Sequence, residues 1–180
     1  EQQETLKTPS DYCLPALVSH EELDAFLAKE EEGIARKERI SSLYRLSPMQ
    51  EGMLFHHLYD SDSHAYKDQF TFELPEGLDE RAFVQAWEFV LHNHTILRSS
   101  FVYDELSIPV QCVYKETKLP IEVLDFSQLD EVERSEKTDT FMAADLQKAF
   151  DFKQAPLMRI MLIKCGPKAV QVVWTSHHIL

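Results

Sequence analysis

Two strongly apolar segments near the C-terminal end constrain the fold more than any other part of the chain. Leu157–Ile163 is apolar apart from one arginine, and Val170–Thr175 alternates with the period of two that is typical of a strand. Both segments are apolar enough on both sides to be buried in a sheet. Because the connection 164–168 is short and contains Gly166, the two segments are predicted to form an antiparallel hairpin.

Two adjacent histidines, His177 and His178, follow the second segment where its strand is expected to end. Imidazole has an ordinary pKa of roughly 6.5, so it exchanges protons near neutral pH. The end of a buried strand holds such a side chain rigidly and leaves one of its faces open to a cleft. The pair is therefore a candidate catalytic site, although on spacing alone two such histidines are more often structural or surface residues.

Upstream segments predict further strands and two long helices. The apolar spacing indicates amphipathic helices over 79–91 and 130–150, and strands over 66–74, 109–114 and 121–125. These helices and strands interleave without a strict β–α–β alternation. The predicted fold class is therefore α+β or α/β, with a mixed sheet covered by helices.

A shorter helix is predicted to start at Ser47–Gln50 and to run to about Tyr59. Serine is a good N-cap, proline suits the first helical position, and the glutamine can reach back to the cap. His56 and His57 lie inside this helix and point about 100° apart, so they cannot chelate one ion together. We interpret both as ordinary core or surface histidines.

The N-terminal residues 1–43 are interpreted as an inter-domain linker. Ser19 and Glu22 form a capping-box pattern and predict a helix over 19–37 with a single apolar stripe. This helix is expected to lie solvated on the surface of the domain that follows.

Charge and composition exclude several classes of function. Lysine and arginine number 18 against 31 aspartates and glutamates, which gives a net charge of -13. Such an acidic surface argues against nucleic acid or anionic membranes as partners, because both require a basic footprint. No apolar run approaches the ~20 residues of a membrane span. Cys13, Cys112 and Cys165 are far apart, which fits a reducing cytoplasm and indicates neither a disulfide framework nor a zinc site.

Three stretches, in the right order, resemble the motifs of condensation domains from nonribosomal peptide synthetases. Tyr44–His56 resembles their opening motif, and His94–Phe101 resembles the second motif, RHExLRTxF. Ser176–Leu180 resembles the first part of the active-site motif HHxxxDG, so we expect a lobe over 44–180 that is truncated within this motif. The chain departs from the second motif at three positions, Asn93, Thr95 and Ser99.

The resemblance implies a chloramphenicol-acetyltransferase-like lobe, the N-terminal one of two that enclose a tunnel. In such domains the amine of an acceptor aminoacyl group attacks the thioester of a donor peptidyl group. The resemblance implies that His178 takes the proton of this amine or positions it, and that His177 is structural. It also implies that Arg98 pairs with the aspartate of HHxxxDG. Because that aspartate is absent from this chain, Arg98 is expected to be solvated or locally rearranged.

Cofactor, partners and location follow from the same resemblance. No cofactor is expected on the lobe itself, since the substrates arrive on the phosphopantetheine arms of carrier domains. The expected partners are the donor and acceptor peptidyl carrier domains and the C-terminal lobe of the same domain, in the cytoplasm. Thr8–Asp11 followed by Ser19–Leu27 is similar to segments that follow an upstream epimerization or carrier domain.

Three alternatives stay open at this point. An epimerization domain shares the fold and HHxxxDG but inverts an α-carbon, and its opening motif differs from that of this chain. A non-catalytic module would use residues 1–43 to dock a neighbouring domain. A metal site built from His92, His94 and the histidine pair is disfavoured, because no carboxylate spacing accompanies these residues. The chain alone is expected to fold and to be inactive in condensation.

Overall fold

The two apolar C-terminal segments form the centre of a four-stranded sheet, as their pattern predicts. β8 (Met158–Lys164) and β9 (Ala169–His177) pair antiparallel. β4 (Lys67–Pro75) pairs antiparallel with the other side of β9, and β7 (Ile121–Asp125) pairs parallel with β8. The order β4-β9-β8-β7 makes this a mixed sheet in which β9 is an interior strand. The computed structural model describes residues 7–59, 66–75, 78–166 and 169–180, so part of the predicted 164–168 connection lies outside the described residues.

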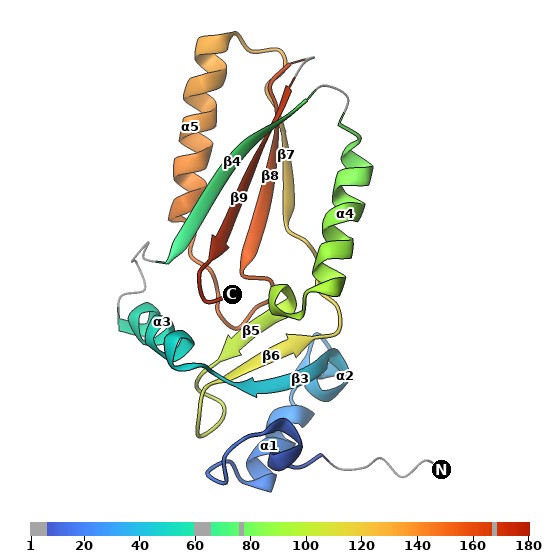
Figure 1. The fold of residues 1–180 in the computed structure, drawn as a ribbon, viewed down its shortest axis with the longest axis vertical. Helices are drawn as coiled ribbons and strands as arrows, with labels where there is room; N and C mark the ends of the chain where they lie inside the picture. Colours follow the sequence, from blue (N-terminus) through green and yellow to red (C-terminus); the bar gives the residue numbers. More distant parts are fainter. Residues whose placement is uncertain (1–6, 60–65, 76–77, 167–168) are drawn as a thin grey trace.

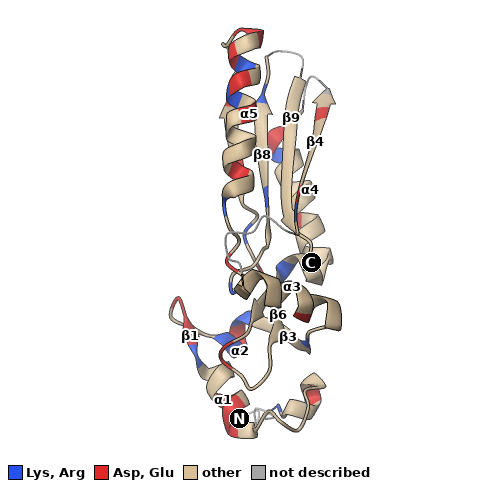
Figure 2. Ribbon diagram, turned by 90° about the vertical axis from the view of Figure 1, so that its left-hand side faces the viewer, with Lys and Arg blue, Asp and Glu red and all other residues tan. Residues whose placement is uncertain are grey.

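The two long predicted helices cover opposite faces of this sheet (Figure 1). α4 (Glu80–Asn93) begins after Asp79, whose carboxylate accepts hydrogen bonds from two backbone amides of the first turn. α5 (Glu131–Gln147) begins after Asp130, which caps it through the amide of Glu133 at 2.9 Å. Figure 2 is viewed from the α5 side, with α5 nearest the viewer and α4 behind the strands. Both helices therefore pack on the sheet, as predicted.

Side chains along the strands of the four-stranded sheet point alternately to its two faces, so the core forms two layers. The layer under α4 contains Leu91, Met158, Ile160, Leu162 and Val172. The layer on the α5 side contains Phe126, Met161, Ile163 and Val173. The apolar side of β4 was predicted to be buried and is less so, since Phe70 is 53% and Phe72 is 41% exposed. β4 is an edge strand, so its side chains are covered less than those of β9.

A second, antiparallel sheet lies beside the end of the first at which β9 terminates (Figure 1). Its order is β3-β6-β5, formed by β3 (Ile40–Arg45), β6 (Val110–Tyr114) and β5 (Ser99–Val102). A short 3-10 helix, η2 (Thr95–Arg98), leads from α4 into β5. The segment of β3 was not predicted as a strand, because its serines and arginine interrupt the apolar pattern.

The N-terminal segment differs from the prediction in the extent of its helix. After η1 (Pro9–Tyr12), helix α1 covers only His20–Ala28, so the prediction of a helix to residue 37 is wrong. The chain then turns through the hairpin of β1 (Glu30–Glu31) and β2 (Ile34–Ala35) and a single helical turn, α2 (Arg36–Arg39). The glycine at the hairpin turn has φ +78°, a conformation that glycine adopts without strain.

Helix α1 belongs to the core rather than to a solvated surface. Its apolar stripe, Leu23, Phe26 and Leu27, is 0%, 3% and 8% exposed. These side chains pack in one cluster with Ile40 and Leu43 of β3. The expectation that this helix lies solvated on the domain is therefore wrong.

Helix α3 (Pro48–Tyr59) connects the two sheets and begins as predicted. The Ser47 amide donates to the Gln50 side chain at 3.0 Å, and the Gln50 amide donates to the Ser47 hydroxyl at 3.2 Å. Among the described residues, no helix combines the length and the hydropathy that crossing a membrane would require.

Candidate active site

The histidine pair is held where the end of β9 meets the start of β4. β9 extends through His177, whose amide donates to the Leu157 carbonyl at 3.0 Å. His178 lies in the turn that follows, and its amide donates to the Tyr66 carbonyl at 2.7 Å. Pairing of β4 with β9 places Lys67 opposite His177 and Asp68 opposite Ser176. Strand register therefore decides which side chains surround the two imidazoles.

His177 is a buried, neutral histidine. It is 5% exposed, and its ring packs edge-on against Phe152 at 4.7 Å. Burial, together with the neighbouring charges of His57 and Lys67, lowers the pKa of His177 to about 4. Its Nδ1 accepts a hydrogen bond from the Ile179 amide at 3.1 Å, so the ring proton is on Nε2.

Helix α3 contributes a third histidine to this region. The ring of His57 stacks on Phe152 with 3.9 Å between centroids and 5° between planes. Burial lowers the pKa of His57 as well, although the charge of Asp151 acts in the opposite direction. The interpretation of His57 as an ordinary histidine thus misses its position beside the pair. Its spacing from His177 along the sequence gave no signal of this proximity.

His178 differs from its neighbour in exposure and in partners. Its side chain is 59% exposed, and its Nδ1 lies within hydrogen-bonding distance of the Asp68 carboxylate. A carboxylate accepts a hydrogen bond from a neutral imidazole only where the ring carries its proton on the facing nitrogen. In the described part of the chain no residue hydrogen-bonds to the other nitrogen, Nε2. Nε2 is therefore the nitrogen of this exposed ring that is available to an external partner.

Helix α3, which belongs to the opening motif, also holds the turn after β9. The Gln50 side-chain amide donates to the Ile179 carbonyl at 3.2 Å and to the Gln111 side chain at 3.3 Å. Gln111 in turn donates to the Ser99 hydroxyl at 2.8 Å. One glutamine thus both caps α3 and connects the turn after β9 to the smaller sheet.

Arg98 is buried, so the expectation that it is solvated is wrong. It is 8% exposed, and its Nη1 donates to the carbonyls of Tyr114 at 2.7 Å and Lys115 at 2.6 Å. Nε and Nη2 donate to the carbonyls of Leu91 at 2.8 Å and His92 at 3.0 Å. Arg98 therefore joins the end of α4 to the end of β6 through four backbone carbonyls.

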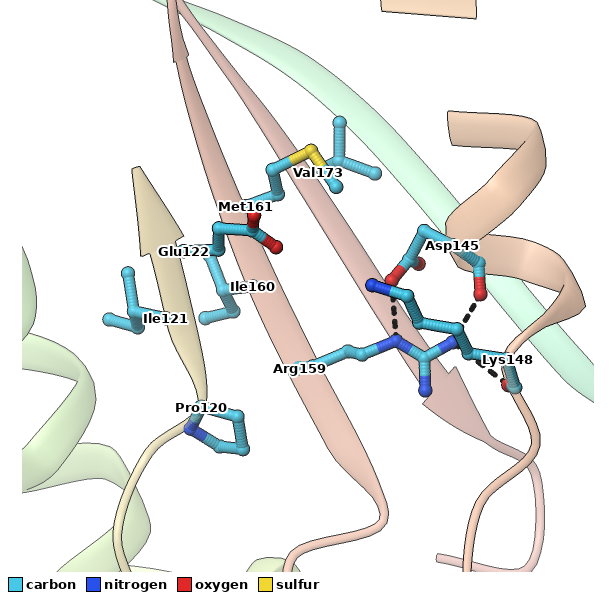
Figure 3. Close-up of a pocket in the computed structure, with 9 residues that line it drawn as sticks. All are labelled: Pro120, Ile121, Glu122, Asp145, Lys148, Arg159, Ile160, Met161 and Val173. Carbon is cyan, nitrogen blue, oxygen red and sulfur yellow. Dashed lines mark hydrogen bonds and ion pairs between the residues drawn. The ribbon is translucent and has the colours of Figure 1, made fainter. Parts of the chain in front are cut away.

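A cavity of about 160 Å³ lies away from the histidines, between the β7–β8 edge and the end of α5 (Figure 3). The buried Asp145 at its wall binds Arg159 Nε at 2.5 Å and accepts from the Thr175 hydroxyl at 2.6 Å. Lys148 and Glu122 also line the cavity. Because its charged wall residues Asp145 and Arg159 are paired with each other, this cavity is a structural feature of the α5 interface.

The four described ranges contain no group of three histidine, cysteine, aspartate or glutamate residues that could hold a metal ion. The metal alternative therefore has no geometric support among them.

Comparison with known proteins decides the family. The model of the condensation domain matches residues 40–180, which is most of the chain. The chain belongs to the condensation-domain family. Tyrocidine synthase 2 of Brevibacillus parabrevis is 35% identical over 144 residues, 80% of this chain and 4% of that protein. Bacitracin synthase 3 of Bacillus licheniformis is 32% identical over 180 residues, 100% of this chain and 3% of that protein. The chain thus spans a small fraction of these relatives.

Solved condensation domains share the fold. The starter condensation domain of rhizomide synthetase superposes with a TM-score of 0.66 at 24% identity, over 77% of this chain and 34% of that one. The first condensation domain of the calcium-dependent antibiotic synthetase gives a TM-score of 0.68 at 16% identity, over 77% and 34%. The mixed sheet with a helix on each face is therefore the chloramphenicol-acetyltransferase-like fold of condensation domains, as predicted.

Proposed function

We propose that this condensation-domain lobe supports amide-bond formation between two carrier-bound substrates, and that His178 assists the attacking amine. The single observation that carries the proposal is the contrast within the histidine pair. His177 is buried, with Nδ1 occupied by a backbone amide, whereas His178 is 59% exposed at the side chain, with Nδ1 on a carboxylate. Only His178 therefore offers an accessible basic nitrogen.

The proposed step balances without a further reactant. The lone pair of the acceptor amine forms a bond to the carbonyl carbon of the donor thioester, which gives a tetrahedral intermediate. The C–S bond then breaks, and the thiolate of the donor arm leaves. The proton lost by the amine passes to Nε2 of His178 and from there to the sulfur.

Two carrier domains with phosphopantetheine arms are the proposed partners, one for the donor and one for the acceptor. The chain covers about a third of the solved condensation domains to which it is similar, 34% in the rhizomide case. We assign the remainder of the tunnel to a C-terminal lobe. Proximity of both reactants can supply roughly 7–11 kcal/mol of a barrier, so one lobe alone is expected to give no amide.

The test uses a full-length synthetase that carries this chain, with loaded donor and acceptor carriers and product analysis by mass spectrometry. His178→Ala is expected to lower the single-turnover rate of amide formation by roughly 10²–10⁴-fold, the usual contribution of a general base, without changing carrier loading. His92→Ala is the matched control, because this histidine at the end of α4 is exposed and Arg98 binds its main-chain carbonyl, which the substitution keeps.

An unchanged rate in His178→Ala would show that the proposal is wrong. A product with an inverted α-carbon and no new amide would assign the chain to the epimerization alternative. Binding of loaded carriers by the unsubstituted synthetase with no amide formed would instead favour the docking module.

A further inference from the structure

We infer that Asp68 is a positioning residue for His178, which fixes the ring proton on Nδ1 and leaves Nε2 as the basic nitrogen. The effect of Asp68 on the reaction rests on the proposed function. Its effect on the tautomer of the His178 ring does not. Sequence patterns gave no indication of this role, because Asp68 lies at the start of a strand and far from the histidine pair along the chain.

The strand β4 and the residue before it hold His178 at two points. The Tyr66 carbonyl accepts from the main-chain amide of His178, and the Asp68 carboxylate binds Nδ1 of its ring. Asp68 is opposite Ser176, two residues before His178, so the register of β4 with β9 places the carboxylate beside the turn. Both the main chain and the ring orientation of His178 are thus set by one rigid element.

The Asp68 carboxylate is available for this role because its neighbours are engaged elsewhere. Successive side chains of a strand point to opposite faces, so Lys67 points away from Asp68. The Lys67 ammonium donates to the Leu146 carbonyl at 3.0 Å on the α5 side. Among the described residues, the His178 imidazole is the only basic group within bonding distance of the Asp68 carboxylate.

The adjacent histidines are consequently held in opposite tautomers. A backbone amide donates to Nδ1 of His177, which places its proton on Nε2. A carboxylate faces Nδ1 of His178, which places its proton on that nitrogen. A general base must present a lone pair to the proton that it abstracts, and Nε2 of His178 does so only in this tautomer.

The first experiment measures the tautomers directly, in the 180-residue protein itself. Two-bond ¹⁵N–¹H correlation spectra at pH about 9 distinguish the two ring nitrogens, because the ordinary imidazole pKa is roughly 6.5 and neutral rings dominate there. We expect the Nδ1–H pattern for His178 and the Nε2–H pattern for His177. In Asp68→Asn, His178 is expected to become a mixture or to switch to Nε2–H. An Nε2–H pattern for His178 in the unsubstituted protein would overturn the inference, whether or not the variant folds.

The second experiment measures kcat and KM for amide formation under steady-state turnover in a full-length synthetase that carries this chain. Asp68→Asn is expected to lower kcat about 10- to 100-fold, which is less than the full contribution of a general base, with KM unchanged because Asp68 does not touch substrate. Asp68→Glu keeps the carboxylate and is expected to recover part of this loss. Glu73→Gln, on the same strand and exposed, is the matched control and is expected to keep the parent rate.

The failures of the two proposals can be distinguished. If His178→Ala lowers the rate and Asp68→Asn leaves kcat unchanged, the positioning role is wrong and the proposed function stands. If His178→Ala leaves the rate unchanged, the proposed function is wrong, and the tautomer spectra alone decide the role of Asp68. A rise in KM with unchanged kcat in Asp68→Asn would also contradict positioning.

Discussion

Arg36 Nη1 lies 2.8 Å from the Glu105 carboxylate, and this ion pair joins the N-terminal segment to the loop between β5 and β6. Lys29 binds the same carboxylate at 2.7 Å, and Glu31 binds the other side of the Arg36 guanidinium. Arg36 is 2% exposed and packs over the Phe26 ring at 4.1 Å. Because a buried charge is tolerated only where it is paired, this network fixes the segment on the lobe.

Phe26→Ala tests whether helix α1 is part of the core. Phe26 is 3% exposed, so its truncation is expected to lower the free energy of unfolding by about 3–5 kcal/mol, as measured by urea denaturation. Asp24→Ala, on the exposed side of the same helix, is expected to change it by less than about 0.5 kcal/mol. Equal, small effects of both substitutions would restore the interpretation of a solvated linker.

Arg159→Met is expected to lower the free energy of unfolding by about 3–5 kcal/mol, because it leaves a buried carboxylate without its charged partner. Asp145 is 4% exposed, and its carboxylate lies 2.5 Å from Nε of the Arg159 guanidinium. Lys137→Met, on the exposed side of α5, provides the control for removing a positive charge from the same region. Thermal unfolding of the two variants gives the comparison, and an Arg159→Met protein as stable as the control would contradict the assignment.

Stability is expected to fall as the pH drops from about 6.5 towards about 4, in part through His177. Its pKa is about 4 in the folded state and ordinary, roughly 6.5, when unfolded. The unfolded chain therefore binds a proton in this pH interval that the folded chain does not. The contribution of His177 to stability is complete above about pH 6.5 and is lost as the pH falls towards about 4. The size is on the order of 2–3 kcal/mol.

Urea denaturation at several pH values between about 6.5 and 4 measures how the free energy of unfolding changes with pH. The variants keep the charged groups that face His177, namely His57, Lys67, His178 and Asp68. His177→Asn should flatten the slope, and His20→Gln, an exposed histidine on α1, should retain it. A slope unchanged in His177→Asn would mean that other groups account for the acid sensitivity.

Arg98→Lys is expected to destabilise the protein by about 2–4 kcal/mol, since the desolvation cost of an unsatisfied buried carbonyl is about 1–3 kcal/mol. An ammonium group cannot span the four carbonyls that the guanidinium reaches at the ends of α4 and β6. Arg81→Lys, an exposed position on α4, is the matched control. Calorimetry gives the melting temperatures of the two variants. Equal values would contradict the assignment, because they would show that the four carbonyls do not depend on the Arg98 guanidinium.

The elements predicted correctly are those whose pattern reflects their own burial. Met158–Lys164 and Ala169–His177 are apolar because they lie inside the sheet, so period and composition were sufficient to find them. Helix α1 was predicted too long, because the charged run after Ala28 has helical propensity, whereas the turn at Gly33 and the pairing of Arg36 redirect the chain. Local pattern carries no information about such long-range pairing.

The histidine pair could be found in the sequence, but its surroundings could not. Asp68 and His57 reach the pair through strand register and the packing of α3, which involve residues about a hundred positions away. The resemblance implied a structural role for Arg98, but it did not predict the carbonyls around this residue, because backbone acceptors leave no trace in composition. Tertiary contacts thus decide the part of the site that sequence reasoning missed.

The most direct test of the account is a double-mutant cycle of Asp68→Asn and His178→Ala in single-turnover amide formation. Because Asp68 is assigned a role only through His178, its substitution is expected to slow the parent about 10- to 100-fold and to have no further effect in the His178→Ala background. The same additional loss in both backgrounds would contradict the account, since it would mean that the two residues act independently.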